Sequence, residues 1–545
     1  MRWSYTHGVS SKPLIGQTIG DFLDAIAAEC GGNEALVSVF ENRRLTYAEF
    51  LDETNLCARA LMALGVEKGD RVGIWSTNCA KWVIVQFATA KIGAVLVNIN
   101  PAYRLHELEF TLRQSECQWL IIGEGFRDAD YAAMVASVET SLPALHRVVS
   151  LVPKTGLLAW DDFVRAAEEI EVAALAERQA SLDFDDVINI QYTSGTTGFP
   201  KGAMLSHHNI LNNGFWIGER MRLTSRDRLC IPVPFYHCFG MVLGNLACVT
   251  HGAAMVLPAP FFSPLHTLEA VARERCTALH GVPTMFIGEL RHPQFREFDL
   301  CSLRTGIMAG APCPNEVMKR VMREMHMAEI TIACGMTETS PVCNMTEVDD
   351  PIELRVSTVG KVMPHQEQKI IDLESQRILP RGAQGELCYR GYQIMCGYYN
   401  NPEGTQQTVD ASGWLHSGDI AVMDEQGYVR ITGRLKDMIC RGGEKIFPRE
   451  VEEFLFTHPK IAEAYVIGAP DTYYGEQVMA WVKLNEGEMM TVEELQAFCH
   501  GQIMDDKIPH YVKFVTEFPT TVTGKIQKYR MRETSTRELE AQTAS

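Results

Sequence analysis

Short apolar strands that alternate with a helix constrain the fold of this 545-residue chain more than any other feature. Arg71–Trp75 and Ala94–Asn98 have the composition of buried strands, and Trp82–Gly93 between them is predicted to form a helix. Two strands joined by one helix at this spacing form a βαβ unit, in which the strands are parallel. The pattern recurs at Trp119–Ile122 and Ala253–Leu257, so the sequence predicts an α/β fold built on parallel sheets.

A local signal marks the start of another helix. Thr46 precedes an apolar run, and Glu49 follows three residues later. A threonine and a glutamate at this spacing form a capping box, in which each side chain bonds to the other residue's backbone N–H. The segment Leu45–Phe50 is therefore predicted to cap and begin a helix.

Length and composition limit the class of protein. The 545 residues are too many for one ordinary domain, so two or more are expected. With 46% hydrophobic and 22% charged residues, the chain has the composition of a globular protein with an ample core. The net charge of −18 argues against nonspecific binding to nucleic acid or anionic membranes. We therefore expect no nucleic-acid partner, and any phosphate ligand needs a local basic pocket.

The cysteines indicate the compartment. There are 16, with no Cys-x-x-Cys pair, and several lie in apolar settings, such as Cys230, Cys248 and Cys334. This usage favours a reducing compartment over a disulfide framework or a zinc site. The segment Met1–Tyr5 opens no apolar run of the kind that begins a secretory signal. A cytoplasmic protein is expected.

The stretch Leu229–Leu268 contains no Asp, Glu, Lys or Arg. A membrane span is one interpretation, but several prolines interrupt the stretch, and His237 and His251 lie inside it. Buried strands and a helix around an apolar pocket are the favoured alternative. We expect no integral membrane segment.

A loop rich in glycine and hydroxyl residues follows the predicted buried strand Val187–Ile190. Residues 192–202 read Tyr-Thr-Ser-Gly-Thr-Thr-Gly-Phe-Pro-Lys-Gly. Glycines let backbone N–H groups converge on one point, the hydroxyls add donors and Lys201 adds positive charge, which suits a polyphosphate. A helix predicted from His207 would assist the same anion with its N-terminal end. Composition alone favours an exposed flexible loop, and Lys201 lacks the Ser or Thr that follows the lysine of the common nucleotide loop.

The amino-acid sequence of this loop closely resembles that of the phosphate loop of the adenylate-forming superfamily. This superfamily includes acyl-CoA synthetases, luciferases and peptide-synthetase adenylation domains. The match to Thr-Ser-Gly-Thr-Thr-Gly-x-Pro-Lys-Gly is complete, and the resemblance spans about residues 20 to 532. It is closest to the medium-chain fatty acyl-CoA synthetase branch. The resemblance implies a large N-terminal domain, residues 1–435, with parallel and mixed sheets flanked by helices and a distorted barrel-like subdomain. It implies a small mobile α+β C-terminal domain at residues 436–545.

The resemblance assigns nucleotide contacts in the larger domain. It assigns triphosphate binding to the loop residues Thr193, Ser194, Gly195, Thr196, Thr197, Gly198 and Lys201. One wall of the adenine site falls on Gly310, Ala311 and Pro312, at the end of a predicted strand. The segment Ile330–Glu338 resembles Tyr-Gly-x-Thr-Glu and brings in Cys334, Gly335 and Met336. Thr337 would then donate to the α-phosphate, and Glu338 would ligate Mg²⁺, a cation that prefers oxygen ligands.

One residue departs from the family pattern. Cys334 stands where an aromatic side chain usually stacks on adenine, and a thiol loses part of that stacking area. The departure leaves open how tightly a purine binds and which base is chosen. It also leaves open the alternative that this chain is a nucleotide-binding protein without catalytic activity.

Further roles follow from the resemblance. Asp419, expected in a turn over Gly413–Asp419, falls on the ribose hydroxyls, because a carboxylate accepts two hydrogen bonds at once. Arg434 is a second ribose or phosphate contact. His237, in the segment Pro232–Gly240, falls where an aromatic or histidine side chain gates the acyl pocket.

The last motifs belong to the smaller domain. Lys436 falls on the hinge, and Gly442 with Gly443 falls on the tunnel for the pantetheine arm of coenzyme A. Lys525, within Pro519–Ile526, resembles the lysine that reaches the carboxylate and the α-phosphate. There it would offset charge that builds in the transition state.

The resemblance implies an ATP-dependent ligase. A carboxylate attacks the α-phosphorus of MgATP to give acyl-AMP and pyrophosphate, and CoA then displaces AMP after the small domain rotates about Lys436. ATP, Mg²⁺ and coenzyme A are the expected substrates and metal, with no tightly bound prosthetic group. The uncharged 229–268 region favours an aliphatic or aryl acid over an amino acid, and leaves the chain length open. A stand-alone adenylation enzyme that loads a carrier protein is the alternative, and a homodimer is a candidate assembly.

Overall fold

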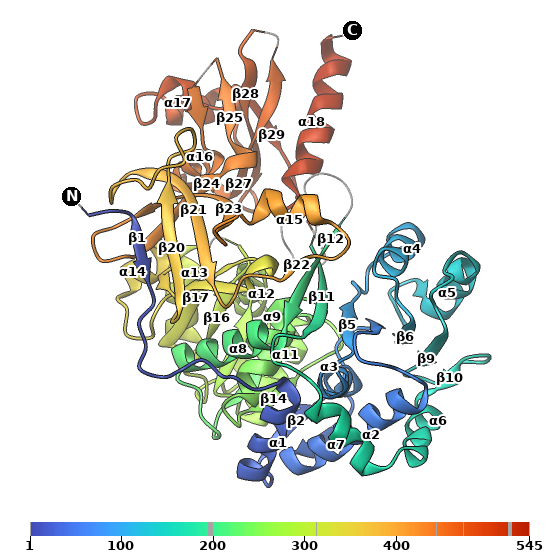
Figure 1. Ribbon diagram of the computed structural model, residues 1–545. Helices are drawn as coiled ribbons and strands as arrows, with labels where there is room; N and C mark the ends of the chain where they lie inside the picture. The colour runs from blue at the N-terminus through green and yellow to red at the C-terminus, as the bar shows by residue number, and fades with distance from the viewer. Residues whose placement is uncertain are drawn as a thin grey trace. The chain divides into compact units, whose positions relative to one another are not determined.

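The computed structural model describes residues 2–193, 200–311, 313–442, 444–471, 473–520 and 526–543. The chain divides into two compact units. The larger unit comprises Thr6–Gln368 and Tyr389–Leu415, and the smaller comprises Met1–Tyr5, Lys369–Cys388 and His416–Ser545. Both are mixed α/β structures in which helices pack on sheets (Figure 1).

An eight-stranded sheet carries the glycine-rich loop of the larger unit. Its strand order is β10 (Leu158–Ala159), β9 (Arg147–Ser150), β6 (Trp119–Ile122), β4 (Arg71–Trp75), β5 (Val95–Asn98), β11 (Val187–Thr193), β12 (Lys201–Ser206), β22 (Gly397–Tyr398). Helix α3 (Ala80–Ile92) connects β4 to β5, and the two strands are parallel. The predicted βαβ unit is confirmed. At the other end of the order, β11 is parallel to β5, and β12 is antiparallel to both β11 and β22.

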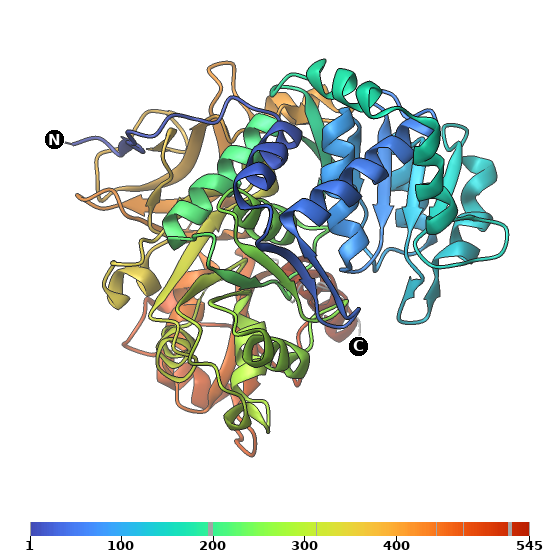
Figure 2. The same cartoon turned by 90° about the horizontal axis from the view of Figure 1, so that it is seen from below.

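Alternating side chains along this sheet enter two different cores. Leu96 of β5 packs in the cluster formed with the helices α1 (Ile19–Cys30), α2 (Tyr47–Ala63) and α3. Val95 and Val97 face the opposite way, toward α4 (Leu105–Gln114) and α5 (Tyr131–Val138). Successive strand residues point to opposite faces, so a sheet covered on both sides is apolar at every position. Figure 2 shows the blue and cyan helices along the strands of this part of the chain.

A nine-stranded sheet completes the core of the larger unit. Its order is β19 (Lys361–Val362), β18 (Val342–Met345), β17 (Glu329–Gly335), β16 (Thr305–Ala309), β15 (Ala278–Gly281), β13 (Arg228–Cys230), β14 (Ala254–Leu257), β2 (Glu34–Ser38), β3 (Arg43–Thr46). The strands from β17 to β2 are parallel to one another. Helices that flank these strands include α11 (Pro264–Glu274), α12 (Pro283–Leu290) and α13 (Asn315–Glu324).

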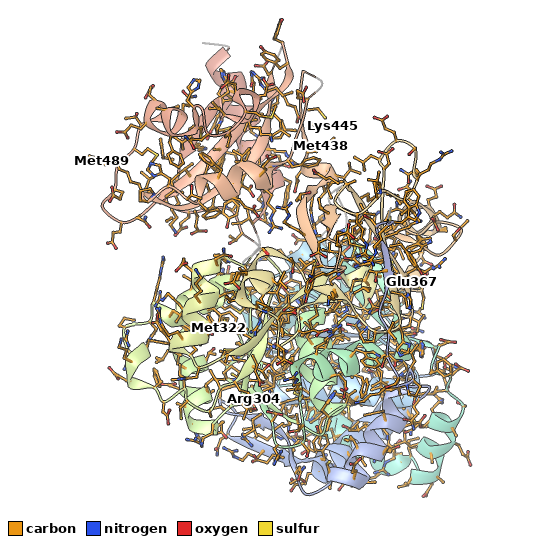
Figure 3. The ribbon with its side chains drawn as sticks, turned by 90° about the vertical axis from the view of Figure 1, so that its left-hand side faces the viewer. Arg304, Met322, Glu367, Met438, Lys445 and Met489 are labelled. Atoms are coloured by element: carbon orange, nitrogen blue, oxygen red, sulfur yellow. The ribbon has the colours of Figure 1, made fainter. Side chains whose placement is uncertain are left out.

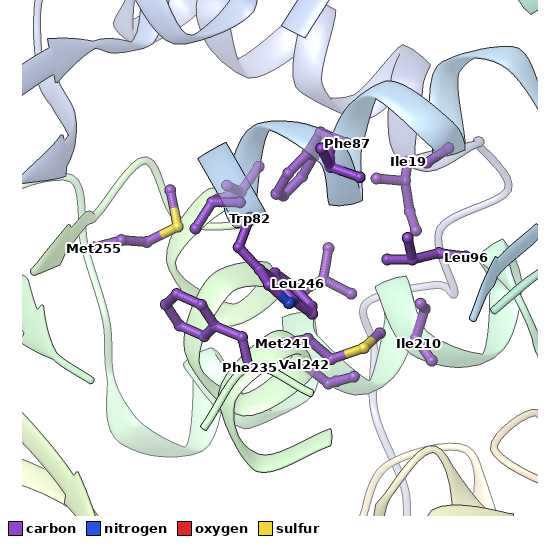
Figure 4. Packing of buried hydrophobic residues seen from close by; sticks show 14 of the residues in the cluster. Ile19, Trp82, Phe87, Leu96, Ile210, Phe235, Met241, Val242, Leu246 and Met255 are labelled. Carbon is purple, nitrogen blue, oxygen red and sulfur yellow. The ribbon is translucent and has the colours of Figure 1, made fainter. Parts of the chain in front are cut away.

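The uncharged stretch Leu229–Leu268 lies in the interior. It contributes strand β14, the turns α9 (Cys238–Gly240), η3 (Met241–Leu246) and α10 (Ala247–Val249), and the start of α11. Its side chains Phe235, Met241 and Leu246 pack with Trp82 and Phe87 of α3 (Figure 4). The interpretation as buried strand and helical structure is confirmed, and the apolar pocket stays a prediction. Among the described helices, none combines the length and apolar composition needed to cross a membrane.

The larger unit contains further elements. They are the hairpin β7 (Gly125–Phe126) and β8 (Ala129–Asp130), and the helices and turns η1 (Glu139–Ser141), α6 (Trp160–Arg165), η2 (Ala166–Glu169), α7 (Val172–Ala180), α8 (His207–Met221), η4 (Phe295–Glu297), η5 (Thr337–Thr339), α14 (Ile352–Ser357), α15 (Pro402–Thr408). The capping box at the start of α2 is present, with Thr46 and Glu49 bonded reciprocally as predicted.

The smaller unit contains two sheets. The first has the order β1 (Tyr5–His7), β20 (Gln366–Ile371), β21 (Gln384–Gly391), β23 (Leu415–Met423), β24 (Val429–Arg434). All of these strands except β24 also include residues that are assigned to the larger unit. The second has the order β26 (Glu444–Ile446), β25 (Ile439–Arg441), β28 (Gly475–Leu484), β27 (Ile461–Asp471), with β29 (Tyr511–Phe514) pairing with β28.

Three helices and two turns accompany the second sheet: η6 (Leu435–Asp437), α16 (Pro448–Leu455), α17 (Val492–Cys499), η7 (Asp505–Lys507), α18 (Lys528–Thr543). Met438 directly follows η6, and Lys445 belongs to the β25–β26 hairpin that comes next (Figure 3). Ile439, Val451 and Val466 meet in a separate small core. The α+β character expected for the C-terminal part is confirmed.

Candidate functional site

The glycine-rich loop joins two antiparallel strands in the sequence. Strands β11 and β12 are antiparallel, and Thr193 pairs with Lys201 at the last rung before the turn. The Thr193 hydroxyl donates to the Lys201 carbonyl over 3.4 Å. The loop residues Ser194, Gly195, Thr196, Thr197 and Gly198 lie outside the described residues. The two ends of the loop are therefore fixed side by side by strand pairing.

The expected role of the following helix is wrong. Strand β12 intervenes, and Ser206 at its end pairs with Val187, at the opposite end of the hairpin from Thr193. At about 3.3 Å per residue, β12 separates the start of α8 from the loop by roughly 15–20 Å. Ser206 caps α8 through Asn209 instead. The N-terminal end of this helix does not assist an anion in the loop.

A tyrosine links Lys201 to a buried carboxylate. The Lys201 ammonium lies 5.0 Å from the centroid of the Tyr398 ring, within the range of a cation–π contact. The Tyr398 hydroxyl donates to Glu338 Oε1 over 2.6 Å. Burial raises the pKa of Tyr398, and the adjacent carboxylate raises it further, so the phenol stays protonated and keeps donating. Lys201, Tyr398 and Glu338 form one cluster, which we call the phosphate-side cluster.

Glu338 is held from two directions. Glu338 is only 6% exposed, and its backbone carbonyl accepts a hydrogen bond from the Met395 N–H over 2.9 Å. The residue lies in η5, directly after β17, in contact with β12. An oxygen ligand fixed in this way fits Mg²⁺, which prefers a few well-placed carboxylate oxygens. Glu338 thus lies in a turn that contacts the strand following the loop, and its role as a metal ligand stays a prediction.

The thiol of Cys238 connects the predicted gate residue to the same place. Burial raises the pKa of Cys238 to about 12; the charge of Glu338 adds to the shift, while a hydrogen bond with Thr337 opposes it. Cys238 therefore lies beside η5. His237, the preceding residue, is exposed and caps α9 through a bond from the Phe239 N–H to its Nδ1.

The predicted adenine residues end two adjacent strands. β16 and β17 are parallel, and Ala309 pairs with Ala333 at their carboxyl ends. Gly310 and Ala311 follow β16 and are exposed, whereas Cys334 lies near the end of β17, Met336 follows that strand, and both are half-buried. An added Cβ at Gly335 would lie 1.8 Å from the Pro341 carbonyl oxygen, so only glycine fits there. Pro312 lies outside the described residues.

In the smaller unit, the two predicted ribose contacts bind each other. Asp419 and Arg434 are register partners in β23 and β24. Arg434 Nε donates to Asp419 Oδ1 over 2.8 Å. The expected turn at Asp419 is wrong, because pairing with β24 places it within strand β23 (Leu415–Met423). The two residues, which we call the strand pair, are brought together by the sheet rather than by a local turn.

Another pair of groups lies on β23 and on β21, its neighbour on the other side from β24. His416 Nδ1 is 3.0 Å from Glu386 Oε2, and Glu386 Oε1 accepts the Gly418 N–H over 3.2 Å. The Cys388 sulfur is also near, 3.7 Å from His416 Nδ1. The two carboxylate oxygens are thus already used to orient His416 and the backbone just before Asp419. Sequence reasoning missed this support for Asp419.

The predicted hinge and tunnel residues lie close in sequence. Lys436 is in η6, where burial lowers its pKa and the charge of Arg434 lowers it further. Gly442 has a φ of 58°, a left-handed conformation that favours glycine, and its N–H donates to the Tyr474 carbonyl over 2.8 Å. Gly443 and Lys525 lie outside the described residues.

Sequence reasoning also missed Tyr398. Its strand, β22, is two residues long and pairs with β12. No local pattern marks such a strand, since its position depends on pairing with a segment almost two hundred residues away. Only the tertiary structure brings this hydroxyl to Glu338.

Comparison with known proteins agrees with this arrangement of motifs. Residues 23–399 match the family of AMP-binding enzymes, and residues 450–525 match the AMP-binding enzyme C-terminal domain. The first match covers more than half of the chain. The chain therefore belongs to the AMP-binding enzyme family.

Relatives and solved structures give the class of reaction. YngI of Bacillus subtilis (strain 168), provisionally named an acyl-CoA synthetase, is 50% identical over 535 residues, covering 95% of this chain and 97% of YngI. The human mitochondrial medium-chain acyl-CoA ligase ACSF2 is 40% identical over 555 residues, covering 98% of this chain and 90% of ACSF2.

Among solved structures, the anthranilate CoA ligase AuaEII with anthranoyl-AMP has a TM-score of 0.85 at 26% identity and covers 97% of this chain and 99% of its own. ATP-bound MatB from Rhodopseudomonas palustris has a TM-score of 0.83 at 28% identity, with 94% and 98% covered. The chain is an AMP-forming acid–thiol ligase that joins a carboxylic acid to CoA through an acyl-adenylate, with ATP and CoA as substrates.

Proposed function

We propose that the acid is a medium-chain fatty acid. The observation that carries this proposal is the uncharged segment Leu229–Leu268, which is folded into the interior of the larger unit. A pocket bordered by such a segment accommodates an alkyl chain and disfavours a charged group, because an unpaired charge is costly to bury. The name of the ACSF2 relatives supports the same chain length.

The phosphate-side cluster is proposed to act on the triphosphate. The loop from Thr193 to Lys201 supplies N–H and hydroxyl donors, and Lys201 supplies a cation next to them. Tyr398 holds Glu338 in place, so that its carboxylate is ready as an oxygen ligand. A bound Mg²⁺ would neutralise phosphate charge during the transfer. Thr337 donates to the α-phosphate, and Gly310 to Pro312 with Cys334 to Met336 border the base.

The smaller unit supplies the other proposed roles. Asp419 and Arg434 bind the ribose, where the sugar hydroxyls share the Asp419 carboxylate with Arg434. Residues 436–545 act as a lid that turns about Lys436. In one position Lys525 reaches the α-phosphate, and in the other Gly442 and Gly443 line the path of the pantetheine arm. His237 gates the acyl pocket.

A panel of acids tests the proposal. Purified protein is supplied with MgATP, CoA and acids from acetate to palmitate, together with benzoate, and AMP release is measured. We expect the highest kcat/KM near octanoate. A maximum at acetate, palmitate or benzoate would refute the medium-chain assignment and leave the ligase class intact. Replacing CoA by a holo-carrier protein separates CoA ligation from carrier loading.

The compartment is proposed to be the cytoplasm. All 16 cysteines are free thiols, which is typical of a reducing environment. Thiol titration of protein taken directly from cells checks this proposal, since an oxidising compartment would leave fewer than 16 reactive thiols after denaturation.

A further inference from the structure

A half-buried carboxylate lies directly after the proposed hinge residue. Asp437 is the last residue of η6, and its side chain is 16% exposed. Arg532 of α18 donates to Asp437 Oδ1 over 2.7 Å. Burial raises the pKa of Asp437, but the charge of Lys528 and the hydrogen bond from Arg532 outweigh burial and hold this pKa below its usual range. The contact is thus between a carboxylate and a guanidinium that are both charged.

Helix α18 is firmly attached to the sheet beneath it. Met531 is fully buried among Ile467, Met479 and Trp481. The Trp481 indole N–H donates to the Ser535 hydroxyl over 3.0 Å. The helix therefore moves with β27 and β28, and whatever Arg532 holds moves with them too.

A second ion pair secures the start of the same helix. Lys528 donates to Glu452 Oε1 over 2.6 Å, and the same oxygen accepts the Val466 N–H over 2.7 Å. Glu452 belongs to α16 and Val466 to β27. The first turn of α18 is thereby joined to both α16 and β27. Lys528 and Arg532 thus attach this one helix to two different parts of the domain.

Two backbone contacts join the chain on either side of the segment that contains Lys525, directly before α18. Thr520 and Ile526 form a β-bridge on either side of residues 521–525. The Gln527 N–H donates to the Pro519 carbonyl over 2.8 Å. Helix α18 begins at Lys528, only three residues after Lys525 in the sequence. The helix is therefore the regular element that comes next after Lys525 in the sequence.

We propose that Asp437 and Arg532 form a brace that joins the residue after the hinge to the helix that follows Lys525. The proposal rests on the proposed roles of Lys436 and Lys525. With the brace, the chain bends at Lys436, and everything from Asp437 onward turns as one body. Without it, the backbone after Lys436 has further freedom, and Lys525 samples a wider range of positions. Asp437 and Arg532 are positioning residues, because they act through Lys525.

The expected size of the effect follows from the geometry of catalysis. A misplacement of about 1 Å in a reacting group costs up to roughly 100-fold in rate. Adenylation needs the Lys525 side chain at the α-phosphate, so the rate of adenylation depends on the brace. Thioester formation from ready-made acyl-AMP does not use Lys525 and depends on the brace less.

A matched control is present on the same helix. Lys513 of β29 and Glu538 of α18 form an ion pair that also attaches α18 to the sheet. Their side chains are 27% and 48% exposed, and the pair involves neither η6 nor the base of the Lys525 segment. If Arg532 served only to hold α18, removing the Lys513–Glu538 pair would have a similar effect.

The experiment compares Arg532→Met, Asp437→Asn, the exchange Asp437→Arg with Arg532→Asp, and the control Lys513→Met. Adenylation is followed by pyrophosphate exchange with the best acid, and thioester formation is followed from synthetic acyl-AMP and CoA. We expect the single changes at Asp437 and Arg532 to slow adenylation about 10- to 100-fold and thioester formation less than about 3-fold, with partial recovery in the exchanged pair. The control is expected to keep both rates.

Hydrogen exchange at residues 435–442 gives a readout that is independent of activity. The brace predicts faster exchange there in Arg532→Met and unchanged exchange in Lys513→Met. Equal slowing of both half-reactions, no recovery in the exchanged pair, or unchanged exchange would overturn the brace. If the wild-type protein exchanges pyrophosphate with none of the acids, the proposed function is refuted instead. The hydrogen-exchange measurement would still test the brace.

Discussion

The phosphate-side cluster and the strand pair use charge in different ways. In the first, Lys201 and Glu338 stand on two sides of Tyr398, which touches one with its ring and the other with its hydroxyl. In the second, Asp419 and Arg434 meet directly over 2.8 Å. Within the described residues, Lys201 forms no ion pair. An aromatic spacer keeps opposite charges close without letting them neutralise each other.

The difference bears on which ligand groups each region suits. A cation held by a ring keeps most of its capacity for an incoming phosphate, because a cation–π contact is weak beside a charge–charge contact. A carboxylate already paired with arginine is better suited to neutral hydroxyls, which add to the pair without displacing it. The first region thus suits phosphates and a metal ion, and the second suits a sugar.

The largest effect is expected outside both regions, at Lys525. Lys525→Ala should reduce adenylation by about 1,000-fold or more, because a cation aimed at developing charge is lost. Thioester formation from supplied acyl-AMP should stay within a few fold of wild type. Pyrophosphate exchange and single-turnover thioester assays measure the two steps. Equal loss of both steps would contradict the assignment of Lys525 to adenylation alone.

The second-largest effect is expected at Glu338, in the phosphate-side cluster. Glu338→Gln removes the charge and keeps the shape, and should slow adenylation by about 100-fold while raising the Mg²⁺ concentration needed for half-maximal rate. Tyr398→Phe is the matched control, since it removes only the hydroxyl that holds Glu338, and should cost about 10-fold. A Mg²⁺ titration of both variants is the measurement. An unchanged Mg²⁺ requirement in Glu338→Gln would place the metal elsewhere.

A smaller effect is expected at the strand pair. Asp419→Asn removes a charged acceptor whose hydrogen bonds are worth about 1.5–3 kcal/mol, so KM for ATP should rise about 10- to 100-fold with kcat little changed. Steady-state kinetics with 2′-deoxy-ATP sharpens the test. The variant and wild type should differ less with this analogue than with ATP. A fall in kcat at constant KM would show that Asp419 does not act on the ribose.

The smallest effect is expected at Cys334. Cys334→Tyr should tighten ATP binding by about 2- to 10-fold, since stacking contributes about 0.5–1.5 kcal/mol beyond the buried area. Calorimetric titration with ATP measures the change, and Cys334→Ser serves as the control without a ring. Unchanged or weaker binding would mean that adenine lies elsewhere.

Local sequence signals were reliable where the physics is local. The capping box at Thr46 and Glu49 formed as predicted, because both bonds close within four residues. Strands β4 and β6 have the predicted bounds, since their apolar residues can be satisfied only inside a covered sheet. Motif wording located the loop, the strand ends at Gly310 and Cys334, and the Glu338 carboxylate.

Long-range strand pairing accounts for the errors. The helix after the loop was expected to begin beside it, but residues 201–206 form β12 because β11 and β22 offer partners on both sides. Asp419 was expected in a turn, but β24 extends the pairing through it. Tyr398 and Arg532 gave no signal at all, because their partners lie 60 and 95 residues away.

The sequence by itself determined the family of this chain, and with it the α/β fold and the class of AMP-forming acid–thiol ligase, because the family's motifs are local residue patterns that follow one another along the chain. The tertiary structure alone decided which charges meet. It set Tyr398 between Lys201 and Glu338, paired Asp419 with Arg434, and joined Asp437 to Arg532. Such contacts depend on strand register and helix packing across long stretches of chain, and no local pattern of residues specifies them.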